Sequence, residues 1–166
     1  SEPMAFGLSA SLAFAYMPMI KMAGLPLIGY RHLPGSVLSG VARRLGMRWR
    51  RQRFSDPRAG MAALDRALEE GRPVGLQTSV FWLPYFPPDM RFHFNAHNLV
   101  VYGRDGEDYL VSDPVFETVR RCDRASLQKA RFAKGAMAGR GLMYAPEGVP
   151  REVDYAREIP KAIRWN

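Results

Sequence analysis

Cysteine is almost absent from this sequence: Cys122 is the only one in 166 residues. A single thiol cannot form a disulfide within the chain, and without a CxxC pair no cysteine-based zinc site can form. Such sparse cysteine is typical of a reducing compartment, so we expect a cytoplasmic protein. We expect neither a metal nor a cofactor.

Charge is missing from one long segment, because no residue between Pro3 and Ile20 is charged. Glycine, serine and proline dilute its hydrophobicity, and Glu2 stands where a secretion signal needs a basic start. We therefore expect buried core here and neither a signal peptide nor a membrane span. Because the chain begins at Ser1 without a methionine, we also expect that further sequence precedes it.

Acidic residues are outnumbered, with 16 Asp and Glu against 24 Lys and Arg, for a formal charge of +8. Such an excess attracts nucleic acid, anionic membranes and acidic proteins alike. Part of it gathers in a cluster interleaved with Trp49 and Phe54, and this pattern fits nucleic-acid binding, docking of an acidic protein, or a solvated surface. The cluster comprises Arg43, Arg44, Arg48, Arg50, Arg51 and Arg53.

Hydrophobic residues make up 47% and charged residues 24% of the chain, as in an ordinary globular domain. The clearest element is a helix that Asp56 caps, with Pro57 at its first position and Gly71 at its end. A second helix is expected over residues 36–45, a third from Asp123 to about Phe132, and the end of another over residues 1–8. Strands are expected over residues 12–17, 25–30, 47–54, 73–80, 99–102, 109–111, 117–122 and 142–144, and an aromatic loop over residues 81–90. This order predicts one α+β domain over residues 1–146, with helices packed on a mainly antiparallel sheet, and a peripheral extension over residues 147–166.

Residues 93–114, HFNAHNLVVYGRDGEDYLVSDP, predict a hairpin with titratable residues at its two open ends. His97 opens a continuous apolar run, which suggests a strand buried on both faces, and Asp113 closes the answering strand before a proline. A three-residue loop centred on Asp105 would make His97 and Asp113 direct partners on one face. A two-residue loop would shift the register by one residue and turn one of them away.

An imidazole in contact with a carboxylate has a well-defined chemistry. The carboxylate fixes the tautomer of the ring and supports its protonated form, so that the other ring nitrogen can take a proton from a thiol or hydroxyl. The alternative is a strand-end histidine next to an Asp-Pro turn with no catalytic role. A metal held by His93, His97 and Asp113 ranks below both, because one hairpin offers few ligands.

The sequence resembles a known family in several motifs. They are HNLVVYG at 97–103, YLVSDP at 109–114, SEPMAFGLSASLAFAYMP at 1–18, GRPV at 71–74 and FWLPYFP at 81–87. The first two resemble the bacteriocin-processing peptidases, and together they resemble more closely the family named for the N-terminal domain of butirosin biosynthesis protein H. This resemblance covers most of residues 1–145. It implies a papain-like fold with His97 as general base, Asp113 as the acid that orients it, and a cysteine nucleophile upstream of Ser1.

The family's namesake transfers an acyl group from an acyl carrier protein to an aminoglycoside amine. The resemblance therefore implies a bacterial, antibiotic-biosynthesis acyltransferase or amidase-type domain that acts on a small-molecule amine. The domain would be an enzyme only together with the upstream cysteine. Cys122 is expected to be structural, although Arg120 and Arg121 beside it would favour a thiolate.

Six further residues are assigned to binding. Gln77, Trp82 and Tyr85 are expected to line a substrate groove, and Arg48, Arg50 and Arg51 to dock an acyl carrier protein. A membrane partner is not expected, nucleic acid is disfavoured, and a homo-oligomer stays open. Two alternatives remain, a papain-like module that binds without catalysis and a basic nucleic-acid-binding protein.

Overall fold

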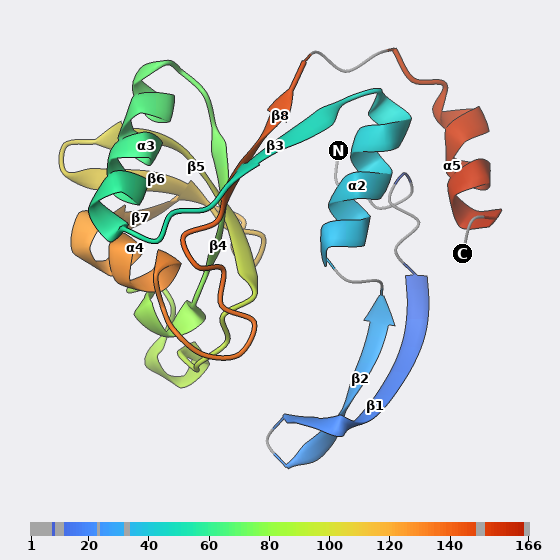
Figure 1. Ribbon diagram of the computed structural model, residues 1–166, viewed down its shortest axis with the longest axis horizontal. Helices are drawn as coiled ribbons and strands as arrows, with labels where there is room; N and C mark the ends of the chain where they lie inside the picture. The colour runs from blue at the N-terminus through green and yellow to red at the C-terminus, as the bar shows by residue number, and fades with distance from the viewer. Residues whose placement is uncertain (1–7, 9–11, 23, 32–33, 149–151, 165–166) are drawn as a thin grey trace. The chain divides into compact units, whose positions relative to one another are not determined.

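The computed structural model describes residues 8, 12–22, 24–31, 34–148 and 152–164 (Figure 1). The chain divides into two compact units, Ser1–Trp49 with Pro146–Asn166, and Arg50–Ala145. A six-stranded sheet has the order β3-β8-β4-β5-β6-β7, and its strands β3 (Arg48–Gln52) and β8 (Met143–Glu147) run across the unit boundaries. The predicted division at residue 146 stays a prediction. Of the helix end expected over residues 1–8, all but Leu8 lies outside the described residues.

The first unit contains an antiparallel ribbon of β1 (Leu12–Met22) and β2 (Leu25–Arg31), followed by α2 (Pro34–Leu45) and, near the C-terminus, α5 (Tyr155–Arg164). Helix α2 confirms the sequence prediction. Strand β1 is longer than expected, because it continues past Pro18. The register shifts between Met17 and Lys21, which accommodates a residue that has no N–H to donate.

For residues 14–20 the ribbon corrects the expectation of buried core, whereas Leu8, earlier in the same uncharged segment, is buried as expected. Among its described side chains, Phe14 is 72% exposed and Met19 is 92% exposed, and Tyr16 and Ile20 are also exposed. The physical reason is the architecture. A sheet of two strands has two open faces and two open edges, so apolar composition alone does not bury its side chains. None of the helices among the described residues is both long and apolar enough to cross a membrane.

The second unit begins with α3 (Pro57–Glu69), the helix that the sequence predicted most clearly. The carboxylate of Asp56 accepts hydrogen bonds from the backbone N–H groups of Arg58 (3.0 Å) and Ala59 (3.1 Å), which caps the helix. The strands β4 (Val74–Thr78), β5 (His97–Asp105), β6 (Asp108–Ser112) and β7 (Arg120–Asp123) follow, with α4 (Arg124–Arg131) after β7. Two short 3₁₀ turns, η1 (Val80–Trp82) and η2 (Pro88–Met90), occupy the predicted aromatic loop.

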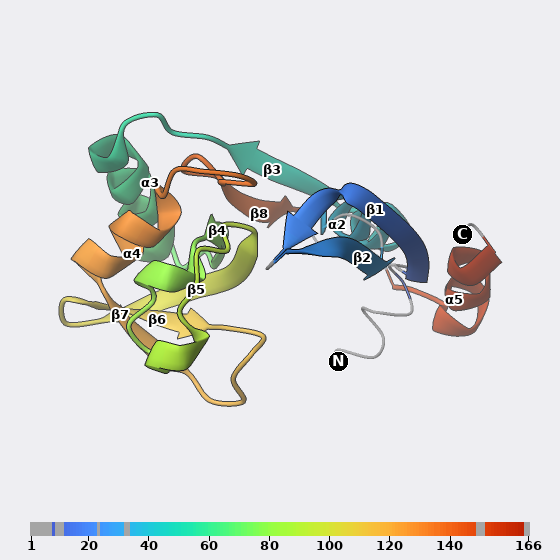
Figure 2. The ribbon, with the colours of Figure 1, turned by 90° about the horizontal axis from the view of Figure 1, so that it is seen from below.

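Strand β4 pairs antiparallel with both β5 and β8, and β6 pairs antiparallel with both β5 and β7. Helices α3 and α4 lie side by side on one face of this sheet (Figure 2). The core between them is continuous, with apolar side chains from both helices and from β4, β5, β6 and β7. Its fully buried members include Met61, Leu64, Val74, Leu76, Leu99, Val101, Val111 and Leu127. The α+β class with an antiparallel sheet is confirmed.

Strand β5 is buried on one face only, which corrects the expectation that its apolar run is buried on both. Leu99 and Val101 point into the core, whereas Val100 and Tyr102 are 38% and 39% exposed. The helices cover one face of the sheet, so alternate residues of the run remain half open to solvent. His97 has the same parity as Leu99 and therefore begins on the core face.

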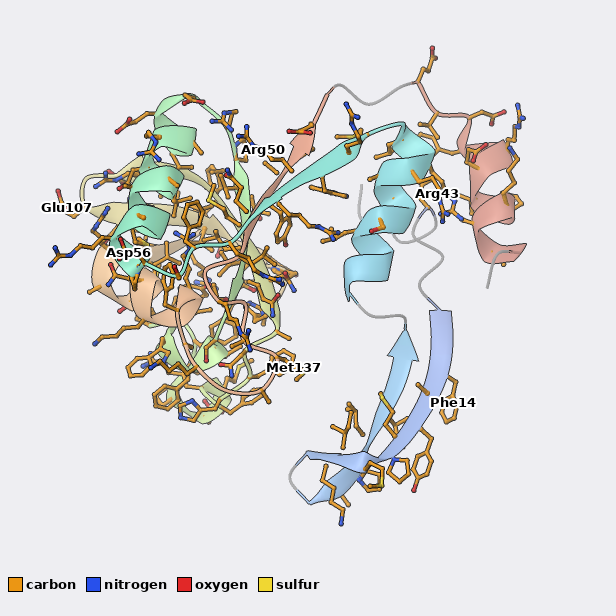
Figure 3. The ribbon with its side chains drawn as sticks, viewed as in Figure 1. Phe14, Arg43, Arg50, Asp56, Glu107 and Met137 are labelled. Atoms are coloured by element: carbon orange, nitrogen blue, oxygen red, sulfur yellow. The ribbon has the colours of Figure 1, made fainter. Side chains whose placement is uncertain are left out.

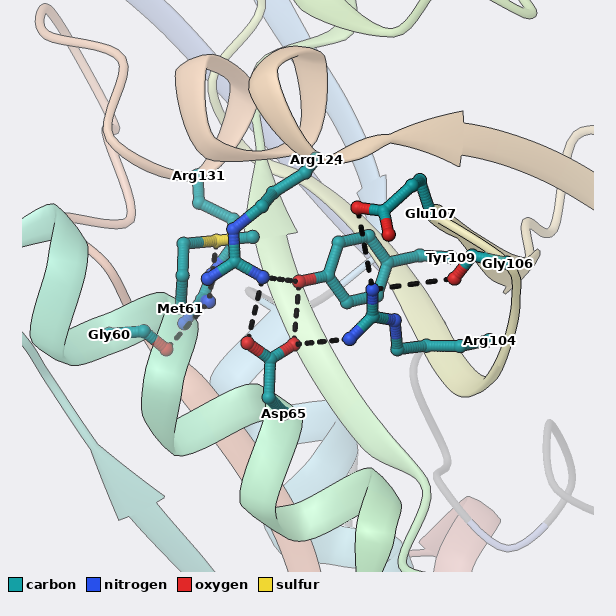
Figure 4. A network of polar contacts seen from close by, with 9 residues as sticks. All are labelled: Gly60, Met61, Asp65, Arg104, Gly106, Glu107, Tyr109, Arg124 and Arg131. Atoms are coloured by element: carbon teal, nitrogen blue, oxygen red, sulfur yellow. Dashed lines mark hydrogen bonds and ion pairs between the residues drawn. The ribbon is translucent and has the colours of Figure 1, made fainter.

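A polar network ties α3 to the β5–β6 hairpin at the edge of the core (Figure 4). The hydroxyl of Tyr109 donates to Asp65 at 2.7 Å, and Arg124 contacts both partners at 2.7 Å. Burial alone would raise the pKa of Asp65, but the hydrogen bonds from Tyr109 and Arg124 outweigh it and lower that pKa. Nearby, the buried Arg131 donates to the carbonyl of Gly60 at 2.9 Å, and burial lowers its pKa to about 10.

Gly75 on β4 leaves room for an aromatic ring. A Cβ atom at this position would lie 2.2 Å from the ring of Tyr144, whose hydroxyl donates to Asn98 at 3.1 Å and so fixes the ring in place. We expect Gly75→Ala to lower the free energy of unfolding by about 3 kcal/mol, as overpacking of a fixed core does. Urea denaturation monitored by circular dichroism measures this loss.

Gly103 provides the matched control for that substitution. It also lies in a strand, but its Cβ would meet only Leu110, at an ordinary 3.6 Å. Gly103→Ala should therefore change stability by well under about 1 kcal/mol. Equal losses for the two variants would contradict the packing role assigned to Gly75.

Candidate active site

His97 and Asp113 meet at the ends of two neighbouring strands. His97 is the first residue of β5 and Asp113 directly follows β6. The Nε2 atom of His97 lies 2.7 Å from Oδ2 of Asp113. The carboxylate side chain is fully covered, whereas the imidazole keeps 10% of its surface exposed. Within the described part of the chain, Nδ1 has no hydrogen-bond partner, so it is the ring nitrogen left for proton transfer.

The register that joins them is neither of the two that the sequence suggested. Asp105 pairs with Asp108, so the loop is the two-residue turn Gly106–Glu107, which by itself would place His97 and Asp113 on opposite faces. A bulge between Val101 and Gly103 then shifts the pairing by one residue. Val101 faces Val111 beyond the bulge, and this parity returns His97 and Asp113 to the same face, as diagonal neighbours.

Asp113 is held by three donors. Oδ2 accepts from the hydroxyl of Tyr85 at 2.8 Å as well as from His97, and Oδ1 accepts from the backbone N–H of Val115 at 3.0 Å. Burial by itself would raise the pKa of Asp113, but these hydrogen bonds favour the ionised carboxylate and lower that pKa. Burial beside the same carboxylate raises the pKa of Tyr85 well above its usual range, so its hydroxyl stays a donor. Asp113 is therefore an ionised, oriented acceptor.

Aromatic rings cover the pair on the core side. The ring of Phe86 meets the imidazole of His97 edge-on, with centroids 5.5 Å apart and an interplanar angle of 88°. Phe116 packs edge-on against both Phe86 (4.9 Å) and Tyr85 (5.7 Å). These contacts limit rotation of the imidazole and exclude water from its bond to Asp113, which strengthens that bond.

The three residues expected to line one groove have different contact partners. Trp82 lines a concave site of about 440 Å³ together with Phe81 and Lys129, and the ammonium of Lys129 lies 5.2 Å from the centre of its ring. Tyr85 bonds Asp113, and the amide of Gln77 donates to the carbonyls of Asn95 (3.1 Å) and Met137 (2.6 Å). A groove role for these residues stays a prediction.

His93 does not share a strand with His97, as the alternative of a metal site on the hairpin required. Strand β5 begins only at His97, and the ring of His93 stacks on Phe81 with centroids 4.0 Å apart. Among the described residues there is no group of three histidine, cysteine or acidic side chains that could hold a metal ion.

Cys122 is a core residue of β7 with 1% exposure. Burial, with Asp123 and Asp108 nearby, raises the pKa of its thiol to about 12. This corrects the expectation that Arg120 and Arg121 would favour a thiolate. Arg120 lies over the ring of Phe116 at 4.2 Å and Arg121 pairs with Asp105, so neither cation is directed at the sulfur. The structural role of Cys122 follows from its burial.

Arg48, Arg50 and Arg51 are exposed on β3. Because side chains alternate along a strand, Arg48 and Arg50 share one face and Arg51 lies on the other, with Trp49. Figure 3 labels Arg50, which is exposed on this strand. The indole N–H of Trp49 donates to the carbonyl of Leu38 at 2.7 Å, so the aromatic residue of the cluster is anchored to α2.

Sequence reasoning missed two features that hold Asp113. The hydrogen bond from the N–H of Val115 could have been predicted from the local sequence, since aspartate side chains often accept from the backbone two residues onward. The hydroxyl of Tyr85 was not, because 28 residues separate it from Asp113 and no spacing rule connects them.

This architecture, with helices on an antiparallel sheet and a histidine–aspartate pair at the strand ends, is the papain-like cysteine-peptidase fold. The structure is similar to the crystal structure of a C39-like peptidase from Bacillus anthracis, with a TM-score of 0.51 and 16% sequence identity over 74% of this chain. The likeness covers 62% of that chain, less than two thirds of its length, and at this identity it shows the fold alone. The model of the family described as Butirosin biosynthesis protein H, N-terminal, matches residues 1–114, and the chain belongs to this family. No curated protein matches it at a significant level.

Proposed function

We propose that His97 and Asp113 are the general base and the orienting acid of a cysteine-dependent acyl-transfer centre in antibiotic biosynthesis. The observation that carries this proposal is the 2.7 Å contact between Nε2 of His97 and a carboxylate that Tyr85 and Val115 hold in place. A carboxylate that accepts from Nε2–H leaves Nδ1 without a proton, and an unprotonated ring nitrogen is what a base requires.

The nucleophile in this proposal is a cysteine outside the 166 residues, because the thiol of Cys122 is buried. Nδ1 of His97 takes the proton of that thiol, and the thiolate attacks the carbonyl carbon of a thioester. The thiol of the donor leaves with the proton from His97, and an acyl-cysteine remains. An amine then attacks the acyl carbon, Nδ1 takes its proton, and the cysteine leaves as the free thiol when that proton returns. Asp113 stabilises the imidazolium in each half.

An acyl carrier protein is the proposed donor. Such carriers are acidic, and the exposed Arg48, Arg50 and Arg51 on β3 offer complementary charge that would speed encounter at low ionic strength. A small-molecule amine is the proposed acceptor, by analogy with the protein for which the family is named. The localisation proposed with this chemistry is cytoplasmic.

The test compares this chain with a version extended upstream through the preceding encoded residues. Thioester cleavage is followed by release of free thiol, and acyl transfer by mass spectrometry of an added amine. We expect turnover only in the extended version, and none when its upstream cysteine is replaced by alanine. Equal activity in both versions would contradict the proposal that an upstream cysteine is the nucleophile. Inactivity of both would favour a binding module without catalysis.

Ionic strength adds a second arm to the same experiment. With an acyl carrier protein as donor, salt should lower kcat/KM, because it screens the encounter of opposite charges. With a small uncharged thioester the same salt should have little effect. Equal salt dependence for the two donors would reject the docking role of the arginines.

A further inference from the structure

A second concave site lies in the Arg50–Ala145 unit, between the entry to α3 and the segment after α4. Its volume is about 620 Å³. One side comes from residues 53–55 and the other from residues 132–140, which are far apart in the sequence. The lining residues are Arg53, Phe54, Ser55, Phe132, Ala133, Lys134, Gly135, Ala138 and Arg140.

The charge of this cavity has one sign. Arg53, Lys134 and Arg140 line it, and no acidic side chain is among its lining residues. Within the described part of the chain, none of the three cationic groups forms an ion pair or a side-chain hydrogen bond. Asp56 is the neighbouring carboxylate in the sequence, but both its oxygens accept backbone N–H groups of α3. Cations without acidic partners around a hollow create a potential that attracts anions.

The apolar part of the cavity is fixed. Phe54 and Phe132 are its large apolar lining residues. A Cβ atom on Gly141 would lie 2.5 Å from the ring of Phe132 and 2.5 Å from the carbonyl oxygen of Phe54, and one on Gly60 would lie 2.6 Å from the same ring. The two glycines therefore allow the backbone to hold Phe132 closely, and the ring presents a rigid surface that a planar or aliphatic group can cover.

The segment that carries Lys134 and Arg140 is held in an uncommon conformation. Met137 and Arg140 have φ angles of 57° and 51°, in the left-handed region that side chains other than glycine rarely adopt. Side-chain hydrogen bonds from two other segments hold it in this conformation. Gln77 donates to the carbonyl of Met137 at 2.6 Å, and Asn95 donates to the carbonyl of Ala136 at 3.0 Å (Figure 3 shows Met137). Strain maintained by the surrounding structure is characteristic of ligand clamps.

From these observations we propose that the cavity binds a small organic anion. A phosphate or carboxylate group contacts Arg53, Lys134 and Arg140, and a planar or aliphatic part lies on Phe54 and Phe132. Guanidinium groups suit this role because they bind such anions through paired, charge-assisted hydrogen bonds. The inference goes beyond the proposed acyl transfer, and it is tested by equilibrium binding, so that either proposal can fail without the other.

The experiment titrates the full 166-residue chain with phenyl phosphate and measures binding by calorimetry and by NMR chemical shifts. Phenol and inorganic phosphate are titrated in parallel. We expect phenyl phosphate to bind more tightly than either. The triple variant Arg53→Gln, Lys134→Gln, Arg140→Gln should bind it at least about tenfold more weakly, which corresponds to the loss of one charge-assisted hydrogen bond or more.

The matched control is Arg66→Gln, which removes an exposed cation of α3 that does not line the cavity. It should bind phenyl phosphate like the unsubstituted chain. The three substituted side chains are exposed, so the triple variant should fold, and circular dichroism checks this. Absence of phenyl phosphate binding at millimolar concentration, equal binding by the triple variant, or an equal loss in Arg66→Gln would each overturn the proposal.

Discussion

Replacing His97 by alanine in the upstream-extended protein is expected to lower the rate of thioester turnover by a factor of about 10²–10⁴. In the proposed mechanism Nδ1 accepts the thiol proton, because Nε2 is occupied by Asp113 at 2.7 Å. The measurement is single-turnover thiol release with a small thioester, across the pH range in which the unsubstituted protein is active. Without the base, the remaining activity should rise with pH as hydroxide deprotonates the thiol.

Tyr85→Phe separates orientation from proton transfer in the same assay. Its hydroxyl donates to Oδ2 of Asp113, and among the described contacts it forms no hydrogen bond to His97, so its loss should lower turnover by far less than the loss of the base. His93→Ala is the matched histidine control, because that ring stacks on Phe81. A turnover rate that is unchanged in His97→Ala, or lowered equally in His93→Ala, would reject His97 as the base.

Replacing Asp113 by alanine is expected to lower the free energy of unfolding of this chain by about 3 kcal/mol. The substitution leaves the hydroxyl of Tyr85, the N–H of Val115 and the imidazole of His97 without their acceptor in a site from which water is excluded. Urea denaturation measures the loss. Asp89→Ala, which removes an exposed carboxylate from the same unit, should change stability by less than about 0.5 kcal/mol.

The pH dependence of this stabilisation has a definite sign. The folded protein lowers the pKa of Asp113 below the unfolded value of about 3.9, so the ionised carboxylate stabilises the fold above that value. The contribution of this carboxylate to the stability advantage over Asp113→Asn should therefore decline as the pH falls through about 4 toward the lowered folded-state pKa. An advantage that grows on acidification would show that the carboxylate is not the stabilised form.

Local sequence predicted those elements whose signals lie within a few residues. Asp56, Pro57 and Gly71 fixed the ends of α3, because capping and left-handed termination depend only on the neighbouring backbone. Asp123 likewise predicted the start of α4, where its carboxylate accepts from the N–H of Ser126. The exposure of β1 was not predictable in this way, because burial depends on what packs against a strand.

The sequence by itself determined that an imidazole and a carboxylate stand at the two open ends of one hairpin, since strand propensity and the Asp113–Pro114 step are local properties. Only the tertiary structure decided that they meet. A single bulged residue next to Val101 set the face on which each side chain lies, and Tyr85, from a distant loop, holds the carboxylate. The physical reason is that side-chain facing in a sheet depends on the parity of the register, which packing of the whole sheet selects and no single segment encodes.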